Sequence, residues 1–199
     1  MPDVMKLKKG GARERILEKA QELFYTQGFQ NTGINQIIEE SGTAKASFYQ
    51  YFKSKEDLAI AYLQYYESRV VNTMHRLMKK NSSVKEFIHA WSKLINRDIK
   101  YNKNFNGDPF ANFAAQMQRN DHGPITEVIE KVITRMYKLF KAHVERAIKD
   151  GQIPEEKDPR TIARHILQVY QGALFMAKIS GDLSYVEDLE NVFNLVITG

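Results

Sequence analysis

Hydrogen-bond donors and positive charges gather in residues 43–58, which read TAKASFYQYFKSKEDL. If this stretch is helical, Phe48 and Phe52 lie four positions apart on one face, where both can pack into a core. The side chains that fall largely outside that face are donors: Lys45, Ser47, Tyr49 and Gln50. Lysine can reach guanine or phosphate, glutamine can bond adenine, and hydroxyls can reach phosphates or base edges. With the small Ala46 allowing close approach, the pattern predicts a helix that enters a DNA groove.

Two short helices around residues 41–43, Ser-Gly-Thr, must position these donors. The first carries Ile34, Ile37 and Ile38, and the second begins near residue 43 or 44 and ends near residue 52 or 53. Such a pair is typical of a helix-turn-helix, in which the first helix supports the second one in the major groove. The alternative interpretation is an ordinary half-exposed helix followed by a solvated turn.

The rest of the chain has the pattern of an all-α protein. Glycine and proline are few, at 11 and 5 of 199 residues, and apolar residues recur at spacings of three and four. We expect about nine helices: a trihelical helix-turn-helix domain in residues 1–58 and a larger helical bundle in residues 59–199.

Composition and charge narrow the class of protein. Hydrophobic residues make up 43% and charged residues 27%, which suits a globular core. The net charge of +5 is local, because basic residues cluster near the start and no acid occurs in residues 42–55. Without cysteine, without the apolar segment of a signal peptide and without a run of about 18 apolar residues, we expect a cytoplasmic protein that binds no membrane.

Enzyme chemistry has little support in the residue pattern. The five histidines are widely spaced and form no His-Glu-x-x-His motif. The chain also contains no Gly-rich phosphate loop and no Gly-x-Ser-x-Gly elbow. We therefore expect no enzyme activity, no metal and no cofactor.

The segment TGINQIIEESGTAKASFYQYFKSKEDL resembles the DNA-binding signature of the TetR-type transcriptional repressor family. The residues that carry the resemblance are Thr32, Ile37, Gly42, Lys45, Ser47, Tyr49, Phe52, Lys53, Lys55, Glu56 and Leu58. The match extends over residues 12–63. The chain departs from the usual pattern with Ala46 in place of glycine, with Tyr51 in place of histidine, and with Gly33-Ile34 where a second threonine or serine is common.

The resemblance implies a repressor that binds a palindromic double-stranded DNA operator as a homodimer. The residues that would contact DNA are Thr32, Thr43, Lys45, Ala46, Ser47, Tyr49, Gln50, Tyr51 and Lys55. Among these, the resemblance assigns phosphate contacts to Thr32 and Tyr51. The alternatives are a TetR-like architectural DNA-binding protein without an effector, and a ligand-carrying bundle that binds no DNA.

In the larger unit, the resemblance implies a cavity for a small, mainly apolar effector that releases the repressor. The large, adaptable side chains suited to line it are Tyr62, Tyr66, Trp91, Phe110, Phe113, Met117, Met136, Phe140 and Tyr170. Each of them could equally be ordinary core.

The segment of residues 159–179 is apolar on more than one side, which indicates burial both in its own bundle and against a partner. Together with the last helix it forms our expected dimer interface: Ile162, Ile166, Ala173, Leu174, Ala177, Val192, Phe193 and Val196. An internal helix of a monomer is the alternative.

Overall fold

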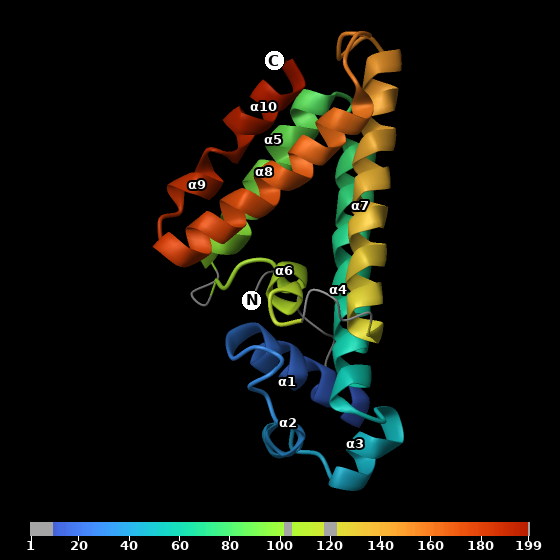
Figure 1. Ribbon diagram of the computed structural model, residues 1–199, viewed down its shortest axis with the longest axis vertical. Helices are drawn as coiled ribbons and strands as arrows, with labels where there is room; N and C mark the ends of the chain where they lie inside the picture. Colours follow the sequence, from blue (N-terminus) through green and yellow to red (C-terminus); the bar gives the residue numbers. More distant parts are fainter. Residues whose placement is uncertain (1–9, 102–104, 118–122, 199) are drawn as a thin grey trace. The chain divides into compact units, whose positions relative to one another are not determined.

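The structure is a computed structural model that describes residues 10–101, 105–117 and 123–198. These residues form helices and no strand, which confirms the predicted all-α class (Figure 1). The helices are α1 (Ala12–Thr26), α2 (Ile34–Glu40), α3 (Lys45–Tyr51), α4 (Lys55–Lys80), α5 (Val84–Tyr101), α6 (Pro109–Ala114), α7 (Pro124–Lys149), α8 (Pro159–Ser180), α9 (Ser184–Glu187) and α10 (Leu189–Thr198).

The last predicted helix is divided in two in the structure. Asp188 ends α9, and its carbonyl oxygen accepts a hydrogen bond from the Val192 N–H at 3.1 Å. Its carboxylate accepts from the Asn191 side chain at 2.8 Å. Asp188 therefore closes one helix and opens the next, so the described residues form ten helices where the sequence predicted about nine.

Helix ends follow the capping residues in the sequence. Ser83 and Glu86 form a reciprocal capping box at α5, with Glu86 N–H donating to Ser83 Oγ at 3.2 Å and Ser83 N–H donating to Glu86 Oε2 at 3.1 Å. Asp158 caps α8 by accepting from Arg160 N–H at 3.1 Å, and the left-handed Gly181 ends that helix. Hydrogen bonds lower the pKa of both capping carboxylates. The bond from the Ser82 side chain contributes most at Glu86, and the bond from the Thr161 side chain contributes most at Asp158.

The chain divides into two compact units. The first unit contains Met1–Arg69 and Pro109–Lys131, and the second contains Val70–Asp108 and Val132–Gly199. Helices α4 and α7 each contribute one part to each unit. The helix-turn-helix therefore shares its unit with α6 and with the first turns of α7.

An aromatic cluster forms the core of the first unit. The Phe24 ring of α1 lies 5.6 Å from Phe29, 6.2 Å from Tyr62 and 5.7 Å from Phe113, measured between ring centroids. Phe113 also lies 5.5 Å from Phe29. Because Phe113 belongs to α6, these contacts pack α6 directly onto α1 and the turn that follows it.

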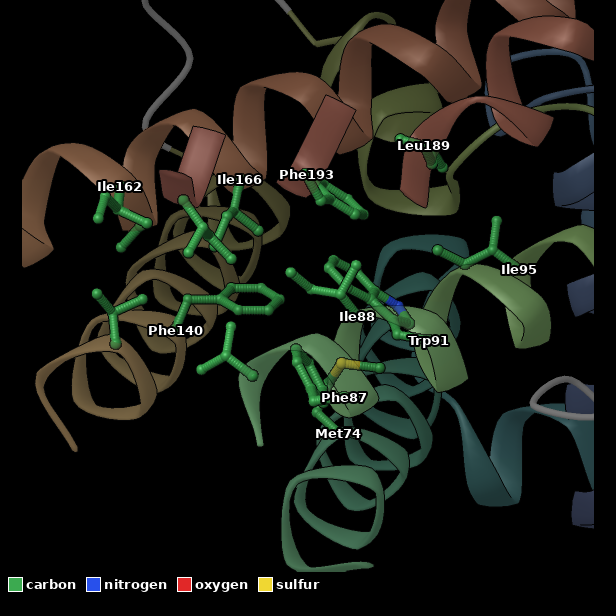
Figure 2. Close-up of a cluster of buried hydrophobic side chains, with 14 of the residues drawn as sticks. Met74, Phe87, Ile88, Trp91, Ile95, Phe140, Ile162, Ile166, Leu189 and Phe193 are labelled. Atoms are coloured by element: carbon green, nitrogen blue, oxygen red, sulfur yellow. The ribbon is translucent and has the colours of Figure 1, made fainter. Parts of the chain in front are cut away.

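Trp91 of α5 occupies the centre of the second unit (Figure 2). Its ring stacks on Phe193 of α10 at 4.9 Å and contacts Phe140 of α7 at 5.1 Å. Tyr170 of α8 lies 5.3 Å away, and Phe87 of α5 lies 5.8 Å away. One indole therefore holds four helices of this unit together.

Within the described ranges, none of the helices has the length and apolar character needed to cross a membrane. In the same ranges, no three His, Cys, Asp or Glu side chains are grouped so that they could hold a metal ion.

Gly28 follows α1 with a φ of +87°, and a Cβ added there would lie 2.8 Å from Gln116 Oε1. That oxygen accepts a hydrogen bond from the Gln30 N–H at 3.1 Å, so the position is closely occupied. Gly28→Ala should lower the free energy of unfolding by on the order of 1–2 kcal/mol, because a side chain strains this left-handed conformation. Urea denaturation followed by circular dichroism measures the change.

The matched control is Gly33→Ala. Gly33 has a φ of −91°, and no heavy atom lies within 4 Å of the added Cβ. We expect a smaller loss there than at Gly28, because the backbone conformation suits any residue and only the preference of the α2 N-cap for glycine over alanine is lost. Equal losses at the two positions would contradict the role given to Gly28.

Candidate nucleic-acid interface

The turn between α2 and α3 is closed by backbone hydrogen bonds. Gly42, with a φ of +61°, donates from its N–H to Glu39 O at 3.1 Å, and the Thr43 N–H donates to Ile38 O at 3.2 Å. This pair of bonds is the Schellman arrangement, which satisfies the last carbonyls of a helix and turns the chain sharply. The turn therefore sets the direction in which α3 leaves α2.

The phase of α3 is set by two buried rings. Phe48 and Phe52 are buried, with ring centroids 6.1 Å apart, as the four-residue spacing predicted. The Arg13 guanidinium of α1 lies 5.5 Å above the Phe52 ring. With this side of α3 in the core, the opposite side faces outward.

The side chains that α3 presents outward form what we name the α3 surface: Lys45, Ala46, Ser47, Tyr49, Gln50 and Tyr51. Ser47 is half-buried and the others are exposed, with 48% of Tyr49 and 41% of Tyr51 accessible. The surface combines a cation, an amide and hydroxyl groups on one short helix, and such groups can bond phosphates and base edges.

Thr32 and Thr43 have their hydroxyls in protein contacts. Thr32 is only 1% exposed, and its Oγ1 donates to Gly28 O at 2.7 Å. The hydroxyls of Thr43 and Ser41 share a hydrogen bond of 2.8 Å inside the turn. Both hydroxyls therefore stabilise turns, that of Thr32 the turn between α1 and α2 and that of Thr43 the turn between α2 and α3.

Lys55 also bonds the protein itself. Its Nζ donates to Phe29 O at 2.9 Å and to Gln30 O at 3.5 Å, and it lies 4.5 Å from the Phe29 ring centroid. Burial lowers the pKa of this ammonium below its usual value. In this structure Lys55 connects the start of α4 to the turn after α1.

Two basic residues of α1 take part in the support of the turn, which the sequence reasoning missed. Arg15 donates from Nε to Ser41 O at 3.4 Å. Lys19 lies 2.7 Å from Glu22 and 3.6 Å from Glu40, which joins α1 to α2, and the hydrogen bond to Glu22 raises its pKa. Their spacing of four along α1 was the available signal, since it places both on one face.

The nine residues predicted to line an effector cavity belong to different units. Those in the first unit are Tyr62, Tyr66, Phe110, Phe113 and Met117, and those in the second unit are Trp91, Met136, Phe140 and Tyr170. In the second unit, a cavity lined by Trp91 and Phe140 measures only about 10 Å³. The core around Trp91 is closely packed in this conformation.

Most of the predicted dimer residues lie inside their own subunit. Ile162, Ile166, Leu174, Ala177 and Phe193 are buried in the core of the second unit, and Ala173, Val192 and Val196 are half-buried. The exposed apolar side chains of the same helices belong to residues outside the predicted set. They are Phe175 and Ile179 of α8, each 59% exposed, and Leu195 of α10, 68% exposed.

Two family models match the sequence. The model described as "Bacterial regulatory proteins, tetR family" matches residues 16–62, and the model described as "Tetracyclin repressor-like, C-terminal domain" matches residues 84–193. The first match contains the whole helix-turn-helix. The second spans α5 to the first half of α10.

Individual proteins agree with the family models. The HTH-type transcriptional regulator LmrA of Bacillus subtilis is 34% identical over 162 residues, which cover 80% of this chain and 84% of LmrA. YxaF of the same organism, also an HTH-type regulator, is 27% identical over 175 residues, 87% of this chain and 88% of YxaF. In fold, the chain is similar to FadR of Bacillus subtilis, solved in complex with stearoyl-CoA, with a TM-score of 0.76 at 18% identity over 93% of this chain and 97% of FadR.

Replacing Lys55 by methionine keeps the length of the side chain but removes its two bonds to carbonyls. Lys55→Met should lower the free energy of unfolding by about 1 kcal/mol, because bonds to a charged donor are lost while the cost of burying the charge disappears as well. Lys53→Met is the matched control, since Lys53 is exposed. Urea denaturation of both variants tests this, and equal losses would contradict the structural role of Lys55.

Proposed function

This chain belongs to the TetR family of bacterial transcriptional regulators, and we propose that it is a repressor that a small-molecule effector releases from a palindromic operator. Membership of this family establishes that the chain is a helix-turn-helix transcriptional regulator. Members of the family are regulators and not enzymes. The observation that carries the proposal is the α3 surface, which presents donors outward while Phe48 and Phe52 are buried behind it. A regulator that acts on the chromosome works in the cytoplasm, where we place it.

We propose that α3 enters the major groove and that the α3 surface makes the DNA contacts. Lys45 and Gln50 have the chemistry to read bases, and Ser47, Tyr49 and Tyr51 can bond phosphates or base edges. Thr32, Thr43 and Lys55 then act from behind, by holding the turns on either side of α2 and α3. The affinity should come mostly from phosphate contacts and fall as salt rises.

We propose residues 1–58 as the DNA-binding domain and residues 59–199 as the domain for effector binding and dimerisation. Helix α6 has a special place in this division, because Phe113 packs on Phe24 and Gln116 accepts the Gln30 N–H. A displacement of α6 would therefore remove support from α1 and from the turn before α2. This gives an effector a physical route to the α3 surface.

The effector is proposed to be mainly apolar and to enter the aromatic core around Trp91. Support comes from FadR, a protein of the same fold solved in complex with stearoyl-CoA. In the present conformation the cavity beside Trp91 has about 10 Å³, so an effector would have to displace side chains such as Phe140. This closed core favours the second candidate function, an architectural DNA-binding protein without an effector.

We propose a homodimer formed by α8 and α10 through their exposed apolar residues. The large apolar side chains of Phe175, Ile179 and Leu195 are exposed to solvent. This exposure does not stabilise a monomer, whereas a partner subunit could bury all three. Gly172 on α8 is exposed as well, and no atom lies within 4 Å of its Cβ position, so a partner helix can approach closely. The buried residues first expected at this interface then form the core behind it.

Operator binding tests the proposed function. Lys45→Ala should weaken binding to operator DNA by on the order of 1–3 kcal/mol and lose discrimination at one base position, if Lys45 reads a base. Fluorescence anisotropy with DNA from upstream of the gene, at several salt concentrations, measures this. Lys85→Ala, with the same charge change on α5, should have little effect.

Two outcomes would count against parts of this proposal. An equal loss on operator and random DNA would mean that Lys45 contacts only phosphate. If the unmodified protein showed no salt-dependent preference for that upstream DNA over random DNA, the repressor function would be wrong.

The dimer face can be tested by placing a charge in it. Leu195→Glu should weaken the dimer by roughly 100-fold or more, because two copies of a buried leucine are lost and two carboxylates are brought together. Sedimentation equilibrium over a concentration series gives the dissociation constant. Ile133→Glu, at an exposed apolar position on α7, is the control, and an equal effect of both variants would contradict the assigned face.

A further inference from the structure

A polar cleft of about 540 Å³ lies in the second unit, where the end of α4, the start of α5 and the end of α7 meet. This volume is in the range of small-molecule sites. None of the residues predicted to bind the effector lines it. Its basic side chains are His75 and Lys79 from α4 and His143 and Arg146 from α7.

Hydrogen bonds between its loops give the cleft a defined wall. The Gln152 side chain accepts from the Val84 N–H at 2.8 Å and donates to Ser82 O at 3.2 Å, which joins the segment after α7 to the start of α5. Asn81 donates to Leu77 O at 2.8 Å, and Ser82 donates to the Glu86 carboxylate. These polar groups are therefore occupied in building the site, and the basic side chains remain to meet a ligand.

The charged side chains that line the cleft offer an anion a place beside Arg146. Lys79 and Arg146 carry permanent positive charges, and the carboxylate in the described lining is Asp150, whose Oδ2 lies 3.5 Å from Arg146 Nε. The C-terminal ends of α4 and α7 repel an anion, but each macrodipole acts as only about half a charge. At α4, the Asn81 side chain already bonds one of the terminal carbonyls. The two positive charges are therefore set against one carboxylate and about half a charge at each helix end, and an anion gains mainly by taking the place of Asp150 beside Arg146.

His143 links the cleft to the apolar core. It lines both the cleft and the small cavity beside Trp91, and its ring lies 4.8 Å from Phe87. Its Nε2 is buried and has no hydrogen-bond partner among the described residues. Burial, and then the charge of Arg146, lower the pKa of His143, so its imidazole is a neutral hydrogen-bonding group.

The cleft also has apolar lining residues, which are Met78, Val84 and Ala147. A ligand that filled the cleft would therefore place carbon against these residues and its charge against Lys79 and Arg146. A metal cation or a fully hydrated ion would use only part of this surface.

We propose that this cleft binds a small organic anion, with a carboxylate or phosphate on a compact apolar body. Arg146 exchanges its exposed contact with Asp150 for the anionic group of the ligand, and Lys79 provides the second positive charge. Met78, Val84 and Ala147 contact the body of the ligand. The site goes beyond the proposed function, because its occupation requires neither DNA nor the aromatic effector cluster.

Titration calorimetry on the full-length protein without DNA tests the site, with benzoate, phenyl phosphate, inorganic phosphate and the neutral benzamide as probes. We expect benzoate and phenyl phosphate to bind at least about tenfold more tightly than benzamide. Benzoate as the better ligand would assign carboxylates, and phenyl phosphate as the better one would assign phosphates. Equal binding of benzamide, binding of inorganic phosphate as tight as that of phenyl phosphate, or no binding at millimolar concentration would overturn the proposal.

Variants locate the binding. Arg146→Gln and Lys79→Gln should each weaken benzoate binding about tenfold, whereas Lys149→Gln, the same charge change outside the cleft, should not. Asp150→Asn should tighten binding severalfold, because it removes the carboxylate that competes for Arg146. Equal losses for Arg146→Gln and Lys149→Gln, or weaker binding in Asp150→Asn, would overturn the site. Thermal melts confirm that each variant is folded, and operator binding is measured separately, so failure of one proposal leaves the other testable.

Discussion

Burial of Phe48 and Phe52 is the constraint on which the outward face of α3 depends. Each ring gains roughly 1.5–3 kcal/mol from leaving water, so rotating α3 about its axis would cost several kcal/mol. No single polar contact on the other side of α3 could balance that cost. The two phenylalanines therefore decide which side chains of α3 are exposed, although both are buried themselves. Lys45 and Gln50 lie on the exposed side and can be exchanged without any change in the fold.

The polar residues around α3 serve mainly to hold its turns. Thr32 and Lys55 both bond backbone oxygens of residues 28–30, and Arg15 bonds Ser41 O on the other side of the motif. Backbone carbonyls in tight turns need such donors when helical partners are missing. Side chains that look like DNA ligands by type can thus be required for the geometry that makes binding possible.

The sequence predicted α3 well because its pattern is one-sided. Two aromatic residues at a spacing of four define the buried face, and the polar residues between them define the other. The pattern of α8 does not show which of its apolar residues are buried. Leu174 and Phe175 are neighbours and both apolar, but Leu174 is buried and Phe175 is 59% exposed. Lys55 could not be understood from its surroundings in the sequence either, since its partner carbonyls lie 25 and 26 residues away. Which aromatic residues share a core is likewise decided by tertiary packing, as Phe24 and Phe113 demonstrate.

The position of α6 makes its own packing and the support of the helix-turn-helix depend on each other. A helix of six residues has too few internal hydrogen bonds to be stable alone, so its place depends on what it packs against. Here Phe113 packs against Phe24 and Phe29, and Gln116, just after the helix, bonds the Gln30 N–H. The same turn, residues 28–30, receives the bonds from Thr32 and Lys55 that support the start of α2 and of α4. A signal that shifts α6 by even a fraction of a helical turn must therefore either break these contacts or carry the turn with it. Because both alternatives alter the turn that leads into α2, a change in the packing of this short helix would reach the helix-turn-helix.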